Sequence, residues 1–297
     1  MRHPEFEAML HDARLYPRIW RIVAGLLLLI IVYVGCTAIV LGITAALVAG
    51  AGSVYEILPF LTTLAIAATP GQVLALLLTF SGMFIGALVA AAALHFRGPE
   101  SLFGPWSEWR RGFLAALAVA LPVLGLLTAI GWLFDAPAPN LDAATWAMLL
   151  PLSLSLLLLQ TGSEELVFRG YLMQQLAARF RARWIWFWLP AILFALLHWS
   201  PEAGANLPLV LLSALTFGLI AADLTERTGS LGAAMGLHFA NNFIALLVVS
   251  IEDTITGLAL YVSDVPIGET GVQSLGIGVS IVVLVGIWAI LRRVLDR

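Results

Sequence analysis

The stretch IVAGLLLLIIVYVGCTAIVLGITAALVAG, residues 22–50, contains 29 residues and not one charged side chain. About 20 consecutive apolar residues are enough for a helix to cross the hydrocarbon core of a membrane. The rest of the chain has a similar composition: 61% of the 297 residues are hydrophobic, 11% are charged, and the mean hydropathy is +0.99. Soluble domains carry about 25% charged residues. This composition excludes a soluble enzyme, a disordered chain and a nucleic-acid-binding protein, and the single cysteine, Cys36, excludes a disulfide scaffold.

Apolar runs of this kind recur along the whole chain. The sequence predicts an all-α, polytopic bundle of about eight transmembrane helices, at residues 22–50, 73–96, 112–134, 143–162, 184–199, 207–222, 231–250 and 272–291. The apolar stretch 55–69 is shorter and ends at Pro70, so it is predicted to be re-entrant, interfacial or a continuation of the first hairpin. The tryptophan-containing stretch 105–111 is predicted to form a short interfacial helix.

The charged residues between these runs predict the orientation. All fifteen basic residues are arginines, and they precede the first run or follow the second, fourth, sixth and eighth: Arg2, Arg14, Arg18, Arg21, Arg97, Arg110, Arg111, Arg169, Arg179, Arg181, Arg183, Arg227, Arg292, Arg293 and Arg297. The intervening loops hold only acids: Glu56, Asp135, Asp142, Glu202, Glu252, Asp253, Asp264 and Glu269. Basic residues stay on the cytoplasmic side. Both termini are therefore expected in the cytoplasm, and the arginine-only usage is typical of a bacterial inner or plasma membrane protein.

Two adjacent acids end the fourth apolar run, in Glu164-Glu165-Leu166-Val167-Phe168-Arg169. An ionisable group within a span costs about 2.5–3.5 kcal/mol on insertion scales, which makes it a functional candidate. Glu165 and Arg169 are four residues apart on a helix and are expected to pair, leaving Glu164 on another face. A free carboxylate there suits a group that takes a proton from water and returns it. An interfacial cluster of charges is the alternative.

Histidines occur in two later runs. His198 ends the segment Phe194-Ala195-Leu196-Leu197-His198, and a single membrane histidine is more often a packed, hydrogen-bonded residue than a ligand. His238 and Asn242 are four residues apart and share one helix face. That pair suits a metal site, an oxyanion site or a simple hydrogen bond between helices.

The depths of these residues lead to a further prediction. Counted from the inner ends of their helices at about 1.5 Å per residue, His198 lies about 21 Å deep and His238 about 10 Å deep. Glu164 reaches a comparable depth only if the fourth helix continues to about Arg179. We therefore expect this helix to extend past the apolar run, with Arg169 partly inside the membrane.

Together these residues resemble a known family. The set Glu-Glu-x-x-x-Arg, Phe-x-x-x-His and His-x-x-x-Asn, in this order on successive helices, resembles the CPBP family of CAAX prenyl endopeptidases and bacteriocin-processing (Abi) intramembrane proteases. The resemblance covers residues 143–250, which are expected to form the catalytic core. Residues 1–142 would then supply about three N-terminal membrane helices, and residues 251–297 an outer loop and the last span.

The resemblance implies hydrolysis of a peptide bond in or next to the bilayer. Glu164 would activate the attacking water with the help of His198, and His238 and Asn242 would stabilise the oxyanion or help to hold a metal. Glu165, Arg169 and Phe194 would support this geometry. The expected substrate is a peptide or membrane protein entering from the bilayer, and CAAX cleavage is not predicted, because bacteria generally lack prenylated CAAX proteins.

The sequence leaves the cofactor open. Glu164, His198 and His238 are a possible ligand set for zinc or another divalent metal with an open water position. The H-E-x-x-H spacing of soluble zinc proteases is absent from the sequence, and a desolvated Glu/His pair is sufficient to activate water without a metal.

Two other functions compete with proteolysis. Acids and histidines in a membrane core also mark the ion paths of transporters and channels, although the sequence shows no inverted repeat. A non-proteolytic membrane partner or immunity protein with the same fold is the other alternative. The oligomeric state is not determined by the sequence.

Overall fold

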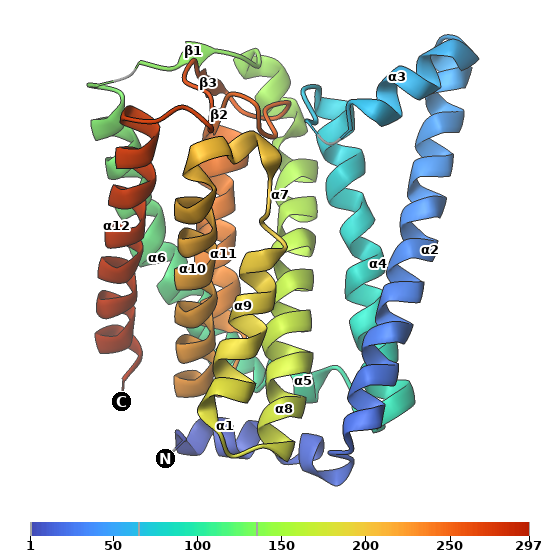
Figure 1. Ribbon diagram of the computed structural model, residues 1–297, viewed down its shortest axis with the longest axis vertical. Coiled ribbons are helices and arrows are strands. Elements are labelled where there is room, and N and C mark those ends of the chain that lie inside the picture. The colour runs from blue at the N-terminus through green and yellow to red at the C-terminus, as the bar shows by residue number, and fades with distance from the viewer. Residues whose placement is uncertain (1, 65, 135, 297) are drawn as a thin grey trace.

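The apolar runs fold as helices that lie side by side in a bundle, as the computed structural model in Figure 1 shows. The structure describes residues 2–64, 66–134 and 136–296, so Asp135 and Arg297, two of the charges used above, lie outside the described residues. Within the described residues, six helices are long and apolar enough to cross a membrane, and two shorter apolar helices cover Trp184–Leu196 and Gly232–Val248. A membrane helix satisfies its own backbone polar groups. The prediction of a polytopic helical membrane bundle is confirmed.

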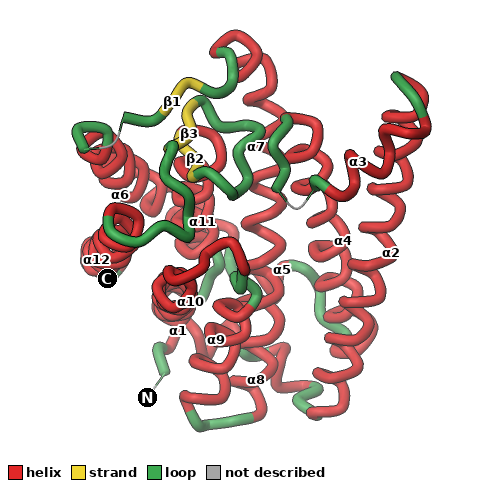
Figure 2. Tube along the Cα trace, turned by 45° about the horizontal axis from the view of Figure 1, so that its top comes forward, coloured by secondary structure: helices red, strands yellow, loops and turns green. Residues whose placement is uncertain are grey.

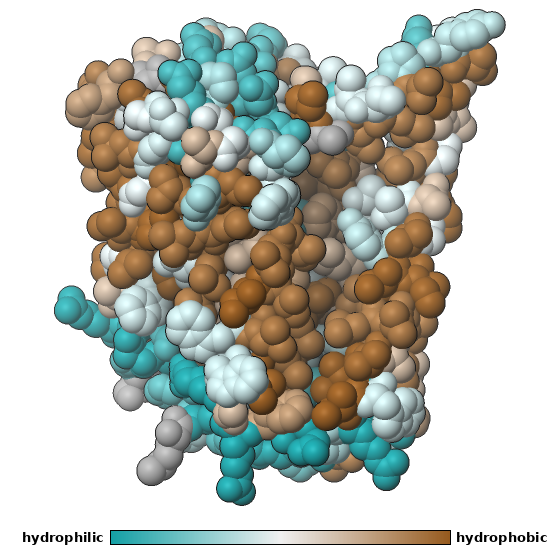
Figure 3. All heavy atoms as spheres, in the orientation of Figure 1, coloured by the Kyte–Doolittle hydropathy of each residue, from teal (hydrophilic) through white to brown (hydrophobic). Residues whose placement is uncertain are grey.

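The polar residues of the surface gather at the two ends of the bundle. In Figure 3, hydrophobic residues cover the middle of the molecule, and hydrophilic residues lie above and below them. Both chain termini lie at the same end (Figure 1), as an even number of crossings requires. The short helix α1 (Pro4–Met9) and the 3-10 turn η1 (Asp12–Leu15) lie across this end.

The first two long helices form a hairpin at one side of the bundle. Helix α2 (Ile19–Ala51) packs against α4 (Pro70–His95), and Figure 1 shows the pair beside the other helices. Close packing depends on Gly86, because a Cβ atom there would lie 2.9 Å from the Leu29 carbonyl oxygen. The predicted short segment between them folds as η2 (Val54–Glu56) and α3 (Ile57–Thr62), at the end opposite the termini.

The third long helix begins earlier than predicted. After α5 (Glu100–Phe103), helix α6 (Trp106–Gly131) is continuous from its first tryptophan. The prediction of a separate interfacial helix at residues 105–111 is therefore wrong. Pro105 precedes the first turn of α6, and nothing within the stretch breaks the helical hydrogen bonding, so these residues form the first turns of the span.

The fourth helix is the longest and carries the paired acids. Helix α7 (Ala143–Glu165) continues through the π-helical segment η3 (Leu166–Met173) into α8 (Gln174–Arg179), making 37 helical residues in all. The predicted extension to Arg179 is confirmed. A π-helical turn within an α-helix often lies at a functional site, and here it starts directly after the paired acids.

The fifth helix is short and the sixth is long. The π-helical η4 (Trp184–Trp188) leads into α9 (Leu189–Leu196), which ends inside the bundle. A 3-10 segment, η5 (Pro201–Asn206), then leads into α10 (Leu207–Thr228). Because α9 stops early, the chain after it is not helical where it passes His198.

The seventh helix lies between α6, α7 and α10. It consists of α11 (Gly232–Phe243) followed by the π-helical η6 (Ile244–Val248). A Cβ atom on Gly236 would lie 2.6 Å from the Phe113 carbonyl oxygen of α6, and a Cβ atom on Gly232 would lie still closer to the Trp109 carbonyl oxygen. These two glycines let α11 approach α6 closely, because small residues four apart on one helix face leave room for a neighbouring backbone.

A small sheet covers the end of the bundle opposite the termini. Strands β1 (Ala138–Pro139), β2 (Val249–Ile251) and β3 (Tyr261–Ser263) have the order β1-β3-β2, with β3 antiparallel to β1 and parallel to β2. Figure 2 shows the three strands in the loops at this end. Helix α12 (Val272–Leu295) then returns the chain to the side of the termini.

Candidate active site

The paired acids of α7 meet a buried arginine one turn further along. Arg169 Nη1 donates to Glu165 Oε1 at 2.9 Å, and Nη2 donates to the Gly218 carbonyl of α10 at 3.0 Å. The side chains of Arg169 and Glu165 are 1% and 0% exposed. The guanidinium carbon also lies 4.7 Å from the centroid of the Phe194 ring. The predicted pairing of Arg169 with Glu165 is therefore present, and it is buried inside the bundle.

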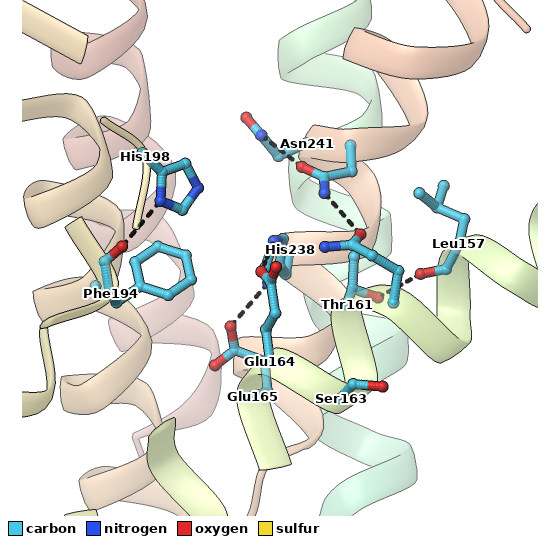
Figure 4. A network of polar contacts seen from close by, with 12 residues as sticks. Leu157, Thr161, Ser163, Glu164, Glu165, Phe194, His198, His238 and Asn241 are labelled. Carbon is cyan, nitrogen blue, oxygen red and sulfur yellow. Dashed lines mark hydrogen bonds and ion pairs between the residues drawn. The ribbon is translucent and has the colours of Figure 1, made fainter. Parts of the chain in front are cut away.

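His238 of α11 lies between the two acids. Its Nδ1 atom is 2.8 Å from Glu165 Oε1, and its Nε2 atom is 3.4 Å from Glu164 Oε2. The first contact is a hydrogen bond, in which Nδ1 donates because a carboxylate accepts. The second is close enough for an ion pair, but Glu164 Oε2 has no hydrogen-bond partner among the described residues. Figure 4 shows the acids and the imidazole together. Glu165 thus fixes the His238 ring, and Glu164 keeps a buried oxygen available beside Nε2.

Asn242 is held by a residue that was not predicted from the sequence. Its Nδ2 atom donates to Gln160 Oε1 at 3.0 Å, and its Oδ1 atom accepts from Asn241 Nδ2 at 3.1 Å. Gln160 is 6% exposed and lies one helical turn before Glu164 on α7. A glutamine in an apolar run, four residues before a functional acid, is the signal that would have identified it.

His198 is on the opposite side of the site. It follows α9, its Nδ1 atom contacts the Phe194 carbonyl oxygen at 2.9 Å, and its side chain is exposed. Figure 4 shows its ring directed toward α11, across from Asn241. Phe194 lies at the edge of the same site, with its ring centroid 4.6 Å from that of His198 and 6.0 Å from that of His238. Within the described residues, Glu164 makes its contact with His238 and not with His198.

The possible metal ligands are not assembled as a metal-binding group. In the described part of the chain, no three His, Cys, Asp or Glu side chains are placed so that they could hold an ion. Glu164 and His238 are adjacent, whereas among the described residues the His198 ring contacts a backbone carbonyl through Nδ1. Among the described residues, Glu164 and His238 therefore form a Glu/His pair, and His198 does not join them as a third ligand.

A comparison with known protein families finds a match in this region of the chain. Residues 145–244 match the family described as type II CAAX prenyl endopeptidase Rce1-like. The chain is also 28% identical over 154 residues to the uncharacterized protein YyaK of Bacillus subtilis (strain 168). That alignment covers 50% of this chain and 51% of YyaK, so the chain spans about half the length of this curated relative. No solved structure shows significant similarity.

The matched segment contains every residue of the site described above, from Gln160 to Asn242. It also contains α9 and α10, whose side chains and carbonyls surround the buried arginine. The family is described as one of endopeptidases, so the match points to proteolysis in general terms. The predicted resemblance is confirmed over residues 145–244, the segment that matches the Rce1-like family.

Proposed function

We propose that this chain is an intramembrane endopeptidase in which Glu164 activates the water that attacks the peptide carbonyl. The observation that carries the proposal is the position of His238, which is bonded to Glu165 through Nδ1 and faces Glu164 through Nε2 at 3.4 Å. A water molecule beside this pair could hydrogen-bond to the Glu164 carboxylate, which would take its proton. Glu165 and Arg169 keep the imidazole in place.

The reaction needs one proton to move twice. Glu164 takes a proton from water as the water oxygen bonds to the carbonyl carbon, and the tetrahedral intermediate that forms carries a negative oxygen. Collapse of this intermediate breaks the C–N bond, and the proton held by Glu164 passes to the leaving nitrogen. No step of this mechanism is routed through a metal.

In this proposal, Asn242 and His198 bind the negative oxygen. Asn242 uses one of its amide N–H groups on Gln160, so the other remains to donate to the oxyanion. His198 is exposed on the facing side of the site, where its Nε2 atom would contact the substrate. Donors placed in advance around a developing charge are usually the largest contribution to catalysis.

The substrate proposed is a membrane-embedded peptide or protein of a bacterial cell membrane. The test is a cleavage assay with the purified full-length chain in detergent, in which peptide fragments are identified by mass spectrometry. Two probes are compared: a farnesylated C-terminal CAAX peptide and the same peptide without the lipid. Cleavage of the unlipidated probe supports the proposed substrate class, and cleavage of the farnesylated probe alone contradicts it.

Variants and a chelator test the mechanism in the same assay. Glu164→Gln should abolish cleavage while the far-ultraviolet circular dichroism spectrum stays unchanged. The control is Glu252→Gln, which replaces an exposed acid at the end of the bundle opposite the chain termini and should leave cleavage normal. Activity that survives a strong chelator supports the Glu/His pair. Activity that is lost with the chelator and restored by zinc contradicts the metal-free mechanism, and cleavage by the Glu164→Gln variant overturns the role of this residue.

A further inference from the structure

A cavity of about 900 Å³ opens at the end of the bundle that carries the chain termini, away from the paired acids. It lies between α1, the start of α6 and the end of α10. We call it the acidic cavity, because its lining includes the four carboxylates of Glu5, Asp12, Glu100 and Glu108. Apolar residues provide most of the remaining surface.

The charge of the acidic cavity is opposite to that of its surroundings. Apart from Arg169 in the candidate active site, the described arginines lie at this end of the molecule. None of them lines the cavity. Glu108 is 3.5 Å from Arg111 and Asp12 is 3.0 Å from His11, so two of the acids are partly compensated. Glu5 and Glu100 are exposed. The cavity therefore presents accessible negative charge on a face that is otherwise basic.

The nearest buried cation, Arg97, offsets only part of this charge, through its electrostatic interaction with Asp12. Arg97 is only 3% exposed and donates to the side-chain and backbone oxygens of Ser101, which lines the cavity. Burial lowers the pKa of Arg97 to about 10, so it stays a cation at neutral pH. Arg97 itself is buried and does not line the cavity, so a ligand inside the cavity would meet the carboxylates.

An aromatic surface lies beside the acids. The Trp106 and Trp109 rings are stacked, with centroids 4.9 Å apart and an interplanar angle of 11°. Trp106 is 69% exposed, so one indole face is accessible to a ligand. Guanidinium and ammonium groups bind over tryptophan faces, most often as arginine. Carboxylates next to an exposed indole therefore suit a cation that has an apolar stem.

We propose that the acidic cavity docks the basic juxtamembrane segment of a second membrane protein. Membrane proteins concentrate arginine and lysine on one side of the bilayer, and this chain has its own arginines on the side where the cavity opens. The flank of another membrane protein would therefore reach the same level with the complementary charge. The apolar lining fits the long aliphatic stems of its basic side chains. This docking does not depend on the proposed hydrolysis.

The test is a titration of the purified full-length chain in a neutral detergent with a synthetic peptide of alternating arginine and leucine. Isothermal titration calorimetry gives the dissociation constant, and a peptide of alternating glutamate and leucine is the control. Both are measured in the Glu164→Gln background, where cleavage cannot contribute. The basic peptide should bind, the acidic peptide should not, and added salt should weaken the binding.

Matched triple variants locate the binding site. Glu5→Gln, Asp12→Asn and Glu100→Gln together should weaken binding of the basic peptide by about tenfold or more, because each exposed ion pair contributes up to about fivefold. The control triple variant carries Glu252→Gln, Asp264→Asn and Glu269→Gln. It removes the same charge from exposed acids at the opposite end and should bind normally.

A further variant tests the aromatic surface. Trp106→Ala should weaken binding, and Trp106→Phe should restore part of it, because an aromatic face is regained. Equal weakening by the two triple variants would show that only net charge matters and would overturn the proposal. So would displacement of the peptide by phosphatidylethanolamine in mixed micelles, which would assign the cavity to a lipid headgroup.

Discussion

Replacing Arg169 by methionine tests the buried charge network that supports the candidate active site. The substitution keeps a long aliphatic side chain and removes the hydrogen bonds to Glu165 and to the Gly218 carbonyl, at 2.9 and 3.0 Å. Glu165 would remain as a carboxylate with 0% exposure, bonded to His238 alone among the described residues. Leaving a buried charge without its partner costs about 3–5 kcal/mol. The free energy of unfolding should fall by that amount.

The assay is reversible unfolding by sodium dodecyl sulfate in mixed micelles, followed by circular dichroism. Because 1.4 kcal/mol corresponds to a factor of ten, the expected loss shifts the unfolding equilibrium by about a hundredfold or more. The control is Arg111→Met, whose partner Glu108 lies 3.5 Å away in a pair with side chains 34% and 27% exposed. Pairs of that kind contribute at most about 1 kcal/mol.

A double variant separates the lost charge pair from lost packing. Glu165→Gln combined with Arg169→Met removes both charges, so no uncompensated ion remains, and the double variant should recover at least half of the lost free energy of unfolding. If Arg169→Met destabilises the protein no more than Arg111→Met does, the buried pair is not the structural support inferred here.

Three other predictions address catalysis, packing and pH. Gln160→Leu removes the acceptor that holds Asn242 and should lower kcat by about 10–100-fold with little change in KM; an unchanged kcat would exclude a positioning role. Gly236→Ala places a Cβ atom 2.6 Å from a backbone oxygen of α6 and should lower the free energy of unfolding by about 1–3 kcal/mol, whereas Gly278→Ala, in open space, should be neutral or stabilising. Asp142 caps α7, and the hydrogen bond that it accepts from a backbone N–H lowers its pKa. Asp142→Ala should therefore lower the Tm at neutral pH, and the difference from the parent chain should disappear as the pH falls and Asp142 becomes protonated. A Tm difference that persists in acid would contradict this.

The sequence predicted the helices well because each membrane helix is specified locally. The uncharged run at residues 22–50 can form only a helix in hydrocarbon, since no other partner is available for its backbone. The boundaries were less certain where polar residues continue a helix. The stretch at residues 105–111 looked interfacial because it is rich in arginine and tryptophan, yet it forms the first turns of α6.

The candidate site was predicted in part. The i,i+4 spacing of Glu165 and Arg169 follows from helix geometry alone, and their hydrogen bond is present. Spacing cannot show which histidine contacts Glu164, because His198 and His238 lie on different helices. The family resemblance implied that His198 assists Glu164, whereas in the structure His238 is beside it. The catalytic roles of these residues stay predictions until the cleavage assay is done.

The sequence by itself determined that this is a polytopic helical membrane protein, which residues in it are polar, and that its arginines gather at one end of the helices. These properties depend on composition and on the local geometry of one helix at a time. Only the tertiary structure decided that His238 bridges Glu164 and Glu165, that Gln160 holds Asn242, and that carboxylates and tryptophans enclose a cavity at the basic end. Contacts between helices depend on how the helices pack, and packing depends on glycine approaches and crossing geometry across the whole bundle.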